Sequence, residues 1–384
     1  MAANEATKKY KRHRQLSLTS TSEVHHYPCS SCGADLLFEP QDGFLTCPYC
    51  GHKQAIAEST EQVEEQSFEQ HLQIRPEQMA SLAVNALEVQ CQSCGARSIF
   101  TPPEVAGRCD FCGVQIVAQP KSADPILTPG GVLPFAVTQQ QATGELREWL
   151  STRWFAPNGL KQFAQPDAIQ GVYLPFWTYD TNTTTDYEGH RGEYYYVTET
   201  YTERDAQGRE VQRTRQVRHT RWYPTSGTVV GSFDDVLIPA TMSLSPARLS
   251  SLEPWDLEAL RSYDPAFLSG FKAQRYQIDL AGGFERAKEV IAPAIEARVR
   301  NDIGGDEQMI ESLSTNYSDV TFKHLLLPVY AGAYRYNGKT YQIMVNGRTG
   351  EIQGERPYSF WKIALLILTI LIFVAILVIA FSSR

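Results

Sequence analysis

Two sets of four cysteines, repeated along the chain at one spacing, are the residues best suited to chemistry. In each set, two Cys-X-X-Cys pairs, each followed by glycine, are separated by fourteen residues. Four-cysteine metal sites use a similar spacing, because two tight turns then present four thiolates in a closed tetrahedron around zinc. Disulfides or redox-active Cys-X-X-Cys motifs are the alternatives. The sequence favours two structural zinc ions, one for each set: Cys29, Cys32, Cys47 and Cys50 in the first, and Cys91, Cys94, Cys109 and Cys112 in the second.

The residues around the cysteines repeat as well. Phe38-Glu39-Pro40 corresponds to Phe100-Thr101-Pro102, and Tyr49 corresponds to Phe111. Each unit is too small for a core of its own, so bound metal supplies much of its folding energy. We therefore expect two zinc ribbons, a fold that binds nucleic acid in some proteins and protein in others.

Other motifs in the chain do not assemble into a catalytic site. All eight cysteines are assigned to zinc, and none of the scattered histidines lies in a His-Glu-X-X-His frame. Residues 333–340 match a permissive phosphate-loop pattern, but they run through an Asn-Gly turn into a strand. A phosphate loop needs a helix there. We expect no enzymatic activity, no catalytic or cofactor-binding residues and no small-molecule substrate.

The C-terminal segment is apolar on every face. Between Phe360 and Phe381 only Lys362 is charged, and these 22 residues would span a hydrocarbon core of about 30 Å as a helix. A buried core helix is the alternative. The basic run from Lys8 to Arg14 is followed by polar residues, so no secretory signal is predicted. We expect a single-pass, tail-anchored membrane protein with its bulk in the cytoplasm, where thiolates stay reduced.

These signals predict an α+β fold in six parts. They are a disordered basic arm (1–26), zinc ribbon 1 (27–57), an acidic linker with helix fragments (58–88), zinc ribbon 2 (89–120), a β-rich α+β domain (121–357) and the transmembrane anchor (358–384).

The large domain should contain a helix capped by Thr138 and a second from Gly283 to Ile303, kinked at Pro293. The expected strands are 171–179, 309–317, 320–336, 339–345 and 351–355. Leu-Pro-aromatic strands in both halves suggest an internal duplication.

A long hairpin is expected to turn at residues 205–208. Its returning strand places Arg213, Arg215 and Arg221 on one face. A four-residue loop would oppose that face with Thr202, Thr200, Thr198, Tyr196 and Tyr194. Such a ribbon can hold RNA or lipid phosphates. Alternatively, the charges only protect an exposed sheet from aggregation.

Further motifs resemble one bacterial family of membrane proteins, often labelled TFIIB-type zinc-ribbon or primosomal replication-restart helicase-like proteins. Besides the ribbon pair, the resemblance covers nearly the whole chain and rests on Gly171-Val-Tyr-Leu-Pro-Phe-Trp177, Phe233-Asp-Asp-Val-Leu237, Leu252-Glu-Pro-Trp-Asp256, Tyr317-Ser-Asp-Val-Thr-Phe322 and Val345-Asn-Gly-Arg-Thr-Gly350. It implies tandem ribbons, a C-terminal membrane segment and no established catalytic activity. For some members it implies association with flotillin-like SPFH proteins and phage-shock-type proteins. The chain shows no helicase motif series, so the helicase label finds no support.

The distribution of charge distinguishes the two functions that remain, binding of protein partners and binding of nucleic acid. The chain has a net charge of −8, and the first ribbon contains no Lys or Arg between Cys29 and Cys50. The second has Arg97 and Arg108 against Glu104 and Asp110. Ribbons that bind nucleic acid usually carry a clustered basic face. We therefore expect a membrane adaptor or scaffold that binds protein partners; the alternative is a membrane-tethered nucleic-acid-binding protein.

Overall fold

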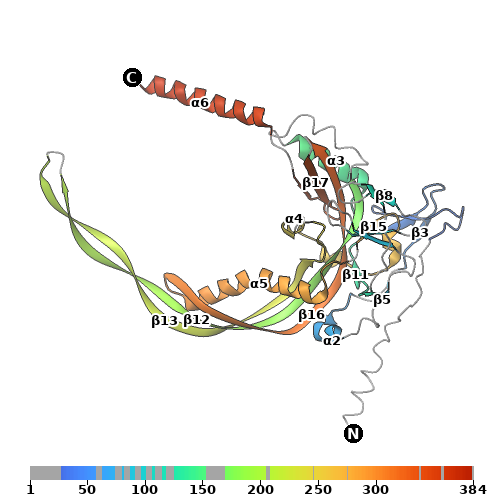
Figure 1. Cartoon of the computed structure of the whole chain (residues 1–384), viewed down its shortest axis with the longest axis horizontal. Coiled ribbons are helices and arrows are strands. Elements are labelled where there is room, and N and C mark those ends of the chain that lie inside the picture. The colour runs from blue at the N-terminus through green and yellow to red at the C-terminus, as the bar shows by residue number, and fades with distance from the viewer. Residues whose placement is uncertain are drawn as a thin grey trace, which may run out of the picture.

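The computed structural model describes residues 27–57, 63–73, 80–81, 87–90, 97–100, 106–108, 115–117, 125–152, 169–204, 208–244, 246–274, 276–336, 339–355 and 359–382. These residues form a mixed, mostly β structure around one nine-stranded sheet, followed by a separate apolar helix (Figure 1). The prediction of a β-rich α+β fold is therefore confirmed in this coarse form. The predicted internal duplication stays a prediction.

Three long antiparallel strands dominate the sheet and curve away from the body as an arm (Figure 1). They are β12 (Ile169–Arg204), β13 (Glu210–Pro239) and β16 (Glu307–Tyr336), with β12 in the middle. Thr181, Thr183, Thr185 and Tyr187 of β12 are buried, and the residues between them are exposed. This alternation shows that one face of the arm packs against the rest of the protein and the other faces solvent.

The sequence predicted shorter strands than the structure contains. The expected strand 171–179 is the first part of β12, and the expected strands 309–317 and 320–336 are one continuous strand, β16. Both strands that neighbour β12 bulge here, with two residues against one: Asp234–Asp235 of β13 lie opposite Asp180, and Asp319–Val320 of β16 lie opposite Thr181. Asp235 and Asp319 take positive φ angles of 48° and 53°. Bulges of this kind bend a strand without ending it.

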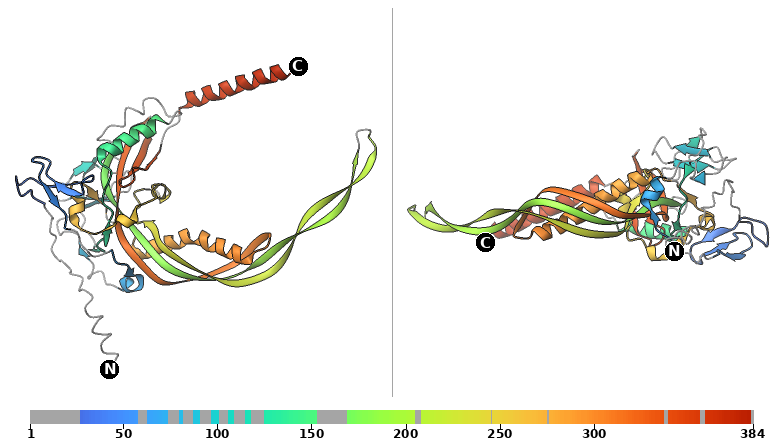
Figure 2. Two further views of the ribbon diagram at one scale, coloured as in Figure 1. Left: turned by 180° about the vertical axis from the view of Figure 1, so that it is seen from behind. Right: turned by 90° about the horizontal axis from the view of Figure 1, so that it is seen from below.

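Helix α5 (Leu280–Ile303) lies along the concave side of the arm (Figure 2). The Asp279 side chain accepts the N–H of Gly282 and caps its first turn. Four residues of one helix face, Ile291, Ile295, Val299 and Ile303, are buried against the sheet. The helix agrees with the expected range, and Pro293 lies within it without ending it.

Shorter strands complete the sheet in the body. β11 (Gly131–Val132) runs parallel to β16 and also pairs with β14 (Arg261–Ser262), which forms one edge. The remaining members are β4 (Gln66–Ser67), β15 (Lys272–Ala273), β17 (Lys339–Asn346) and β18 (Ile352–Gly354). The short helices of the body are α2 (Phe68–Leu72), α4 (Pro246–Ser250), η4 (Leu257–Ala259) and η5 (Pro265–Leu268). β4 and α2 lie within the segment expected to be a linker, and β4 pairs with β16.

Helix α3 (Gln139–Ser151) begins at the predicted cap, Thr138, whose side chain forms a capping box with Gln141. It buries Leu146 and Leu150 in the same core as Tyr173 and Tyr330. The sequence pattern also places Trp154 on the apolar stripe of this helix, but that residue lies outside the described residues.

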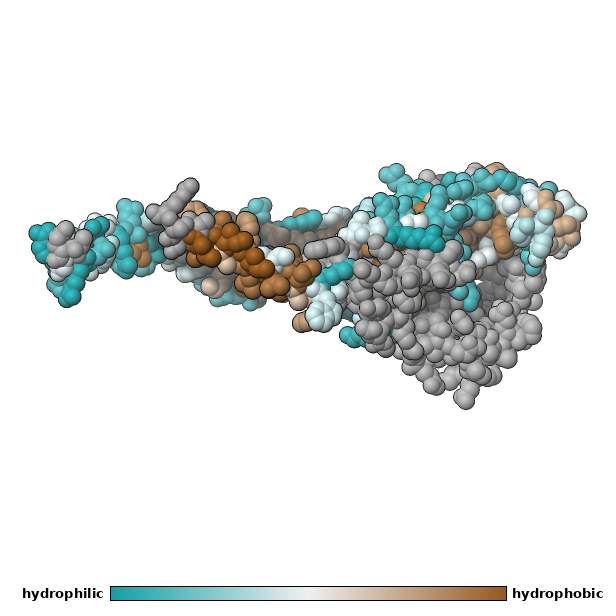
Figure 3. Space-filling view, turned by 90° about the horizontal axis from the view of Figure 1, so that it is seen from above, coloured by the Kyte–Doolittle hydropathy of each residue, from teal (hydrophilic) through white to brown (hydrophobic). Residues whose placement is uncertain are grey.

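Helix α6 (Phe360–Ser382) is long and apolar enough to cross a membrane, and no residue of Phe360–Ile379 is buried inside the described structure. In Figure 3 it forms a continuous hydrophobic surface, whereas the outer part of the arm is hydrophilic. This observation supports a membrane span by length and composition. It does not place the rest of the chain on either side.

Candidate metal centre

Cys29, Cys32, Cys47 and Cys50 lie in two turns of the same local geometry. In the first turn the N–H of Gly33 donates to the Cys29 carbonyl (2.8 Å), and in the second the N–H of Gly51 donates to the Cys47 carbonyl (3.0 Å). Gly33 and Gly51 have φ angles of 77° and 72°, in the left-handed region that favours glycine. The glycine after each Cys-X-X-Cys pair is therefore required by the turn.

The two turns bring the four sulfurs together. All four lie within 4.8 Å of one another, and the Cys29–Cys50 and Cys32–Cys47 sulfur pairs are 3.5 Å apart. Zinc–sulfur bonds of about 2.3 Å in a tetrahedron place sulfurs about 3.8 Å apart. The arrangement therefore fits one zinc ion in a closed site, as predicted for the first set.

The ionisation of the four thiols also fits a cation. Backbone N–H groups of Cys50 and Tyr49 point at the Cys47 sulfur and lower the pKa of that thiol to about 6. At Cys50 the N–H of His52 favours the thiolate, but the neighbouring sulfurs oppose another negative charge and raise the pKa to about 12. A bound divalent cation would remove this conflict and allow all four sulfurs to ionise.

The first ribbon is docked on the large domain. Its sheet contains β1 (Leu37–Glu39), β2 (Phe44–Thr46) and β3 (Lys53–Ala55). Phe38 in β1 packs edge-on against Phe267, with ring centroids 5.5 Å apart, and its N–H donates to the Ser269 carbonyl (3.0 Å). Buried Cys29 and Cys47 belong to the same apolar cluster as Phe135 and Tyr330 of the domain. The metal centre is thus continuous with the protein core.

A cleft of about 730 Å³ lies where the ribbon meets the domain. One wall contains Phe44 and residues 55–57, and the other contains residues 261–264. Within the described part of the chain, β3 pairs only with β2, and β14 pairs only with β11. Each wall therefore includes a strand with one unpaired edge, a feature that spacing arguments on the sequence did not reveal.

The second cysteine set, Cys91, Cys94, Cys109 and Cys112, lies outside the described residues. The short strands around it are described: β6 (Leu87–Gln90) pairs with β7 (Arg97–Phe100), and β8 (Ala106–Arg108) pairs with β9 (Gln115–Val117). A further pair joins β5 (Ala80–Ser81) to β10 (Pro125–Ile126).

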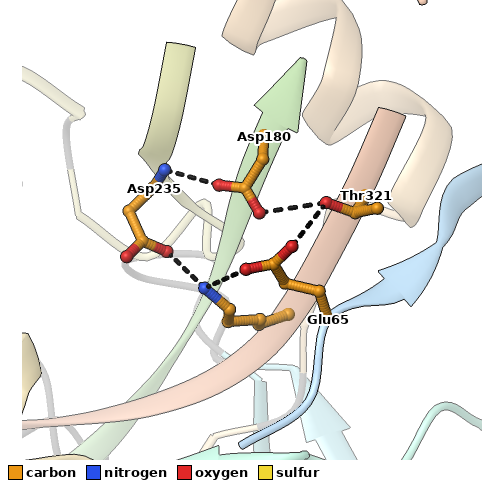
Figure 4. Close-up of polar contacts among 5 residues, drawn as sticks. Glu65, Asp180, Asp235 and Thr321 are labelled. Carbon is orange, nitrogen blue, oxygen red and sulfur yellow. Dashed lines mark hydrogen bonds and ion pairs between the residues drawn. The ribbon is translucent and has the colours of Figure 1, made fainter. Parts of the chain in front are cut away.

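An acidic cluster lies at the bend of the arm (Figure 4). One oxygen from each of Glu65, Asp180 and Asp234 falls within 4.8 Å of the others. Asp180 accepts the N–H of Asp235 at the bulge (2.6 Å) and the hydroxyl of Thr321 (3.0 Å). Lys323 contacts Asp235 (2.8 Å) and Glu65 (3.3 Å). These contacts give the cluster a structural role: it satisfies backbone groups at the bulge and joins β4 to the sheet.

The pairing between β12 and β13 is shifted by one residue from the register expected for the arginine-bearing strand. Arg204 pairs with Glu210, so five residues, not four, separate the strands. Arg213, Arg215 and Arg221 therefore lie opposite Tyr201, Glu199 and Glu193 instead of the expected threonines and tyrosines. Arg213 contacts Glu203 and Arg215 contacts Glu199, both at 3.1 Å. The register assumed for a four-residue loop is therefore wrong: acidic side chains accompany the arginines, and Tyr201 and Tyr195 lie against Arg215 and Arg221.

Comparisons with known proteins give one curated relative and no structural one. The chain is 27% identical over 345 residues to the Bacillus subtilis protein named "Uncharacterized protein YdjG", a match covering 88% of this chain and 92% of that protein. No family model matches the chain. No solved structure matches it. The chain is thus similar to YdjG over most of its length.

Proposed function

We propose that this protein is a non-enzymatic membrane adaptor that binds an extended segment of a partner protein at the junction between its first zinc ribbon and its β-rich domain. The cleft with its two unpaired strand edges is the observation that carries this proposal. An added strand gains main-chain hydrogen bonds from such an edge, while alternate side chains enter neighbouring pockets. Phe38, Phe44 and Phe267 provide apolar contacts for them.

Zinc has a direct part in this function. The cleft wall made by β2 and β3 is a three-residue strand pair that flanks the second cysteine turn, Cys47–Gly51. Without metal, so small a unit would lose its fixed shape. Zinc would therefore act as a structural cofactor of partner binding.

A second structural zinc ion in residues 89–120 belongs to the same proposal. The pairing Ala106↔Val117 repeats Phe44↔Ala55 with an offset of 62 residues at both ends (106 − 44 and 117 − 55). The offset between Cys29 and Cys91 is also 62. The identical offset supports a second ribbon around Cys91, Cys94, Cys109 and Cys112.

We further propose a tail-anchored topology with the ribbons and the domain in the cytoplasm, α6 spanning the membrane, and membrane-scaffold proteins of the SPFH or phage-shock type as partners. Exposed cysteine sulfurs at Cys32 and Cys50 support a reducing compartment. The partner class follows from the family resemblance alone.

A matched pair of substitutions tests partner binding. Phe44→Ala removes a ring that lines the cleft, and Tyr49→Ala removes a ring of the same ribbon that is 82% exposed and does not line it. Full-length variants are captured from mild-detergent membranes and their associated proteins are quantified by mass spectrometry. We expect the captured amount of one set of proteins to fall about tenfold with the Phe44→Ala variant and with the Cys47→Ser/Cys50→Ser variant. The captured amount should be unchanged with Tyr49→Ala.

Partners that persist with all three variants would show that the cleft is not the binding surface. Fluorescence anisotropy with single- and double-stranded oligonucleotides tests the nucleic-acid alternative on the same preparations. We expect weak, salt-sensitive binding without sequence preference. Tight binding at physiological salt that is lost with Arg213→Ala/Arg215→Ala/Arg221→Ala would favour the alternative function.

A further inference from the structure

The outer part of the arm is a bare two-stranded ribbon. Beyond Gly192, which pairs with the first residue of β16, the twelve residue pairs from Glu193↔Arg221 to Arg204↔Glu210 have no third strand beside them in the described structure. We call these pairs the distal ribbon. Asp306 and Glu307 hold its base through Tyr194 and Thr220, and no residue of the distal ribbon is classed as buried.

Such a ribbon is poorly protected against strand addition. A two-stranded hairpin is only marginally stable in water, and an unpaired strand edge is a template for another chain. Natural edges are commonly blunted by proline, but both strands of the distal ribbon lack proline and glycine and are rich in Thr, Tyr and Val. Pro224 lies just outside it.

Six charged side chains of the distal ribbon form two opposite rows on one face. Glu193, Glu199 and Glu203 belong to β12, whereas Arg213, Arg215 and Arg221 belong to β13. The ribbon thus has an acidic strand with one unpaired edge and a basic strand with the other. Its other face carries mainly Thr, Gln and Tyr, with Arg204, Glu210 and Arg218 as its charged residues.

These rows decide which edges can meet. Two β12 edges would place glutamates beside glutamates, and two β13 edges would place arginines beside arginines; both arrangements are destabilising. Pairing β12 of one copy with β13 of another continues the alternation of acidic and basic rows. We propose that copies of this protein associate side by side through their distal ribbons, with the β12 edge of one copy adding to the β13 edge of the next.

The contact is limited to the distal ribbon by the fold itself. Below Gly192 the edge of β12 is already occupied by β16, so a neighbouring β13 cannot extend further toward the body. Because the two surfaces in contact differ, each copy can bind two neighbours, and the series closes into a ring or grows as a filament.

Exchange of the two charge rows tests this arrangement. The swapped chain carries Glu→Arg at positions 193, 199 and 203 and Arg→Glu at positions 213, 215 and 221, so the Arg213–Glu203 and Arg215–Glu199 ion pairs are kept in inverted form. Full-length wild-type and swapped chains with different tags are co-expressed, solubilised in mild detergent and captured. Capture of unlike chains is compared with capture of like chains.

We expect wild-type chains to capture wild-type chains, and swapped chains to capture swapped chains, with at least tenfold less capture between the two kinds. The control exchanges Glu296 and Arg300, an exposed ion pair of α5, and should co-assemble fully with wild type. Stronger capture between unlike than between like chains would identify edges of one kind pairing with each other and overturn the proposal. A wild-type chain that captures no second copy would overturn it as well.

Cysteine cross-linking decides the question if the swapped chain fails to fold. Thr200→Cys on β12 and Thr214→Cys on β13 are introduced into separate, differently tagged chains. Side-by-side pairing predicts cross-links between the two kinds of chain and few between identical chains. Cross-links mainly between two Thr200→Cys chains would contradict it.

Discussion

Four sulfurs from two turns of the same shape are the most specific chemical feature of the first ribbon. Cysteine spacing predicted all four, since the Cys-X-X-Cys-Gly pattern encodes both the sulfur positions and the left-handed glycine of the turn. No comparable pattern predicted the Asp180 cluster, because Glu65, Asp180 and Lys323 lie far apart in sequence and meet only through strand pairing.

Replacing Cys47 and Cys50 by serine should remove one zinc ion per chain. Two of the four thiolates are then lost, and a two-thiolate remainder cannot close the tetrahedron. Elemental analysis of the purified full-length protein measures the loss, with Ser31→Ala in the same ribbon as the control. An unchanged zinc content in the double variant would show that these residues do not hold the metal.

His324 makes the body of the protein sensitive to acid. Its ring is buried between Trp177 and Tyr276, with centroids 4.6 Å and 5.5 Å away, and Nδ1 lies 3.0 Å from the Leu127 carbonyl. Within the described structure Nε2 has no hydrogen-bond partner. Burial lowers the pKa of His324 to about 4, so the folded protein holds the neutral ring.

Stability should therefore fall as the pH drops below about 6.5, the pKa of histidine in an unfolded chain, and level off below about 4. In this pH range the unfolded chain binds a proton that the folded chain does not. The free energy of unfolding should fall by about 3 kcal/mol across the whole range. Urea unfolding at pH 7 and pH 5 measures the difference. His324→Phe should flatten it, whereas His219→Phe on the exposed arm should not. An unaltered pH dependence in His324→Phe would assign the acid sensitivity to other groups.

Local sequence signals identified the helices and the span more successfully than the strands. Thr138 caps α3 as predicted, and the uninterrupted apolar run of α6 needs no partner to be recognised; α5 begins at Leu280, before the expected Gly283, because Asp279 caps it. In contrast, Gly189 and Gly192 occur inside β12, where a Cβ atom would lie 2.3 Å from the Met309 carbonyl oxygen or 2.8 Å from Thr220. A glycine in the sequence can indicate either a turn or a place where two strands lie very close together. Only the partner strand, which is distant in sequence, shows which of these applies.

The register of the hairpin could not be predicted for a related reason. A loop one residue longer than expected exchanges every cross-strand neighbour, so Arg215 meets Glu199 and not Thr198. Loop length depends on turn geometry that short polar sequences do not specify. The three arginines share one face in either register, but one additional loop residue decides that acidic side chains lie opposite two of them.

Packing of helix α5 against the three-stranded part of the arm should contribute to the stability of the protein. Ile295 is buried in the cluster that joins the helix to Tyr187, and its replacement by alanine should lower the free energy of unfolding by about 3 kcal/mol. Val290→Ala on the same helix, where the side chain is 60% exposed, should change it by less than about 0.5 kcal/mol. Chemical denaturation checks both values; equal effects would mean that α5 does not pack as described.

For the whole molecule, α6 should decide where the protein resides. Removing the chain from Phe360 onward deletes the exposed apolar helix and should leave a soluble protein, whereas the intact chain should stay in membranes after carbonate washing. Protease added to right-side-out cells should leave the domain intact. Digestion without lysis would place the domain outside the cell, and a truncated protein that still sediments with membranes would reveal a second attachment.

The central position of β16 in the sheet has a consequence for the order of folding. β4 and β11 precede it by about 250 and 200 residues (Thr321↔Ser67 and Gly131↔Leu325), yet both pair with it. Contacts over such separations form slowly, because the intervening chain must first be brought into a loop. The first ribbon needs only residues 29–50 to close around zinc. We expect pulsed hydrogen exchange to show that the amides of the first ribbon are protected well before those of β11. The ribbon would then bind metal while the main sheet is still unformed. Simultaneous protection of both would instead mean that metal binding and sheet formation are one cooperative event.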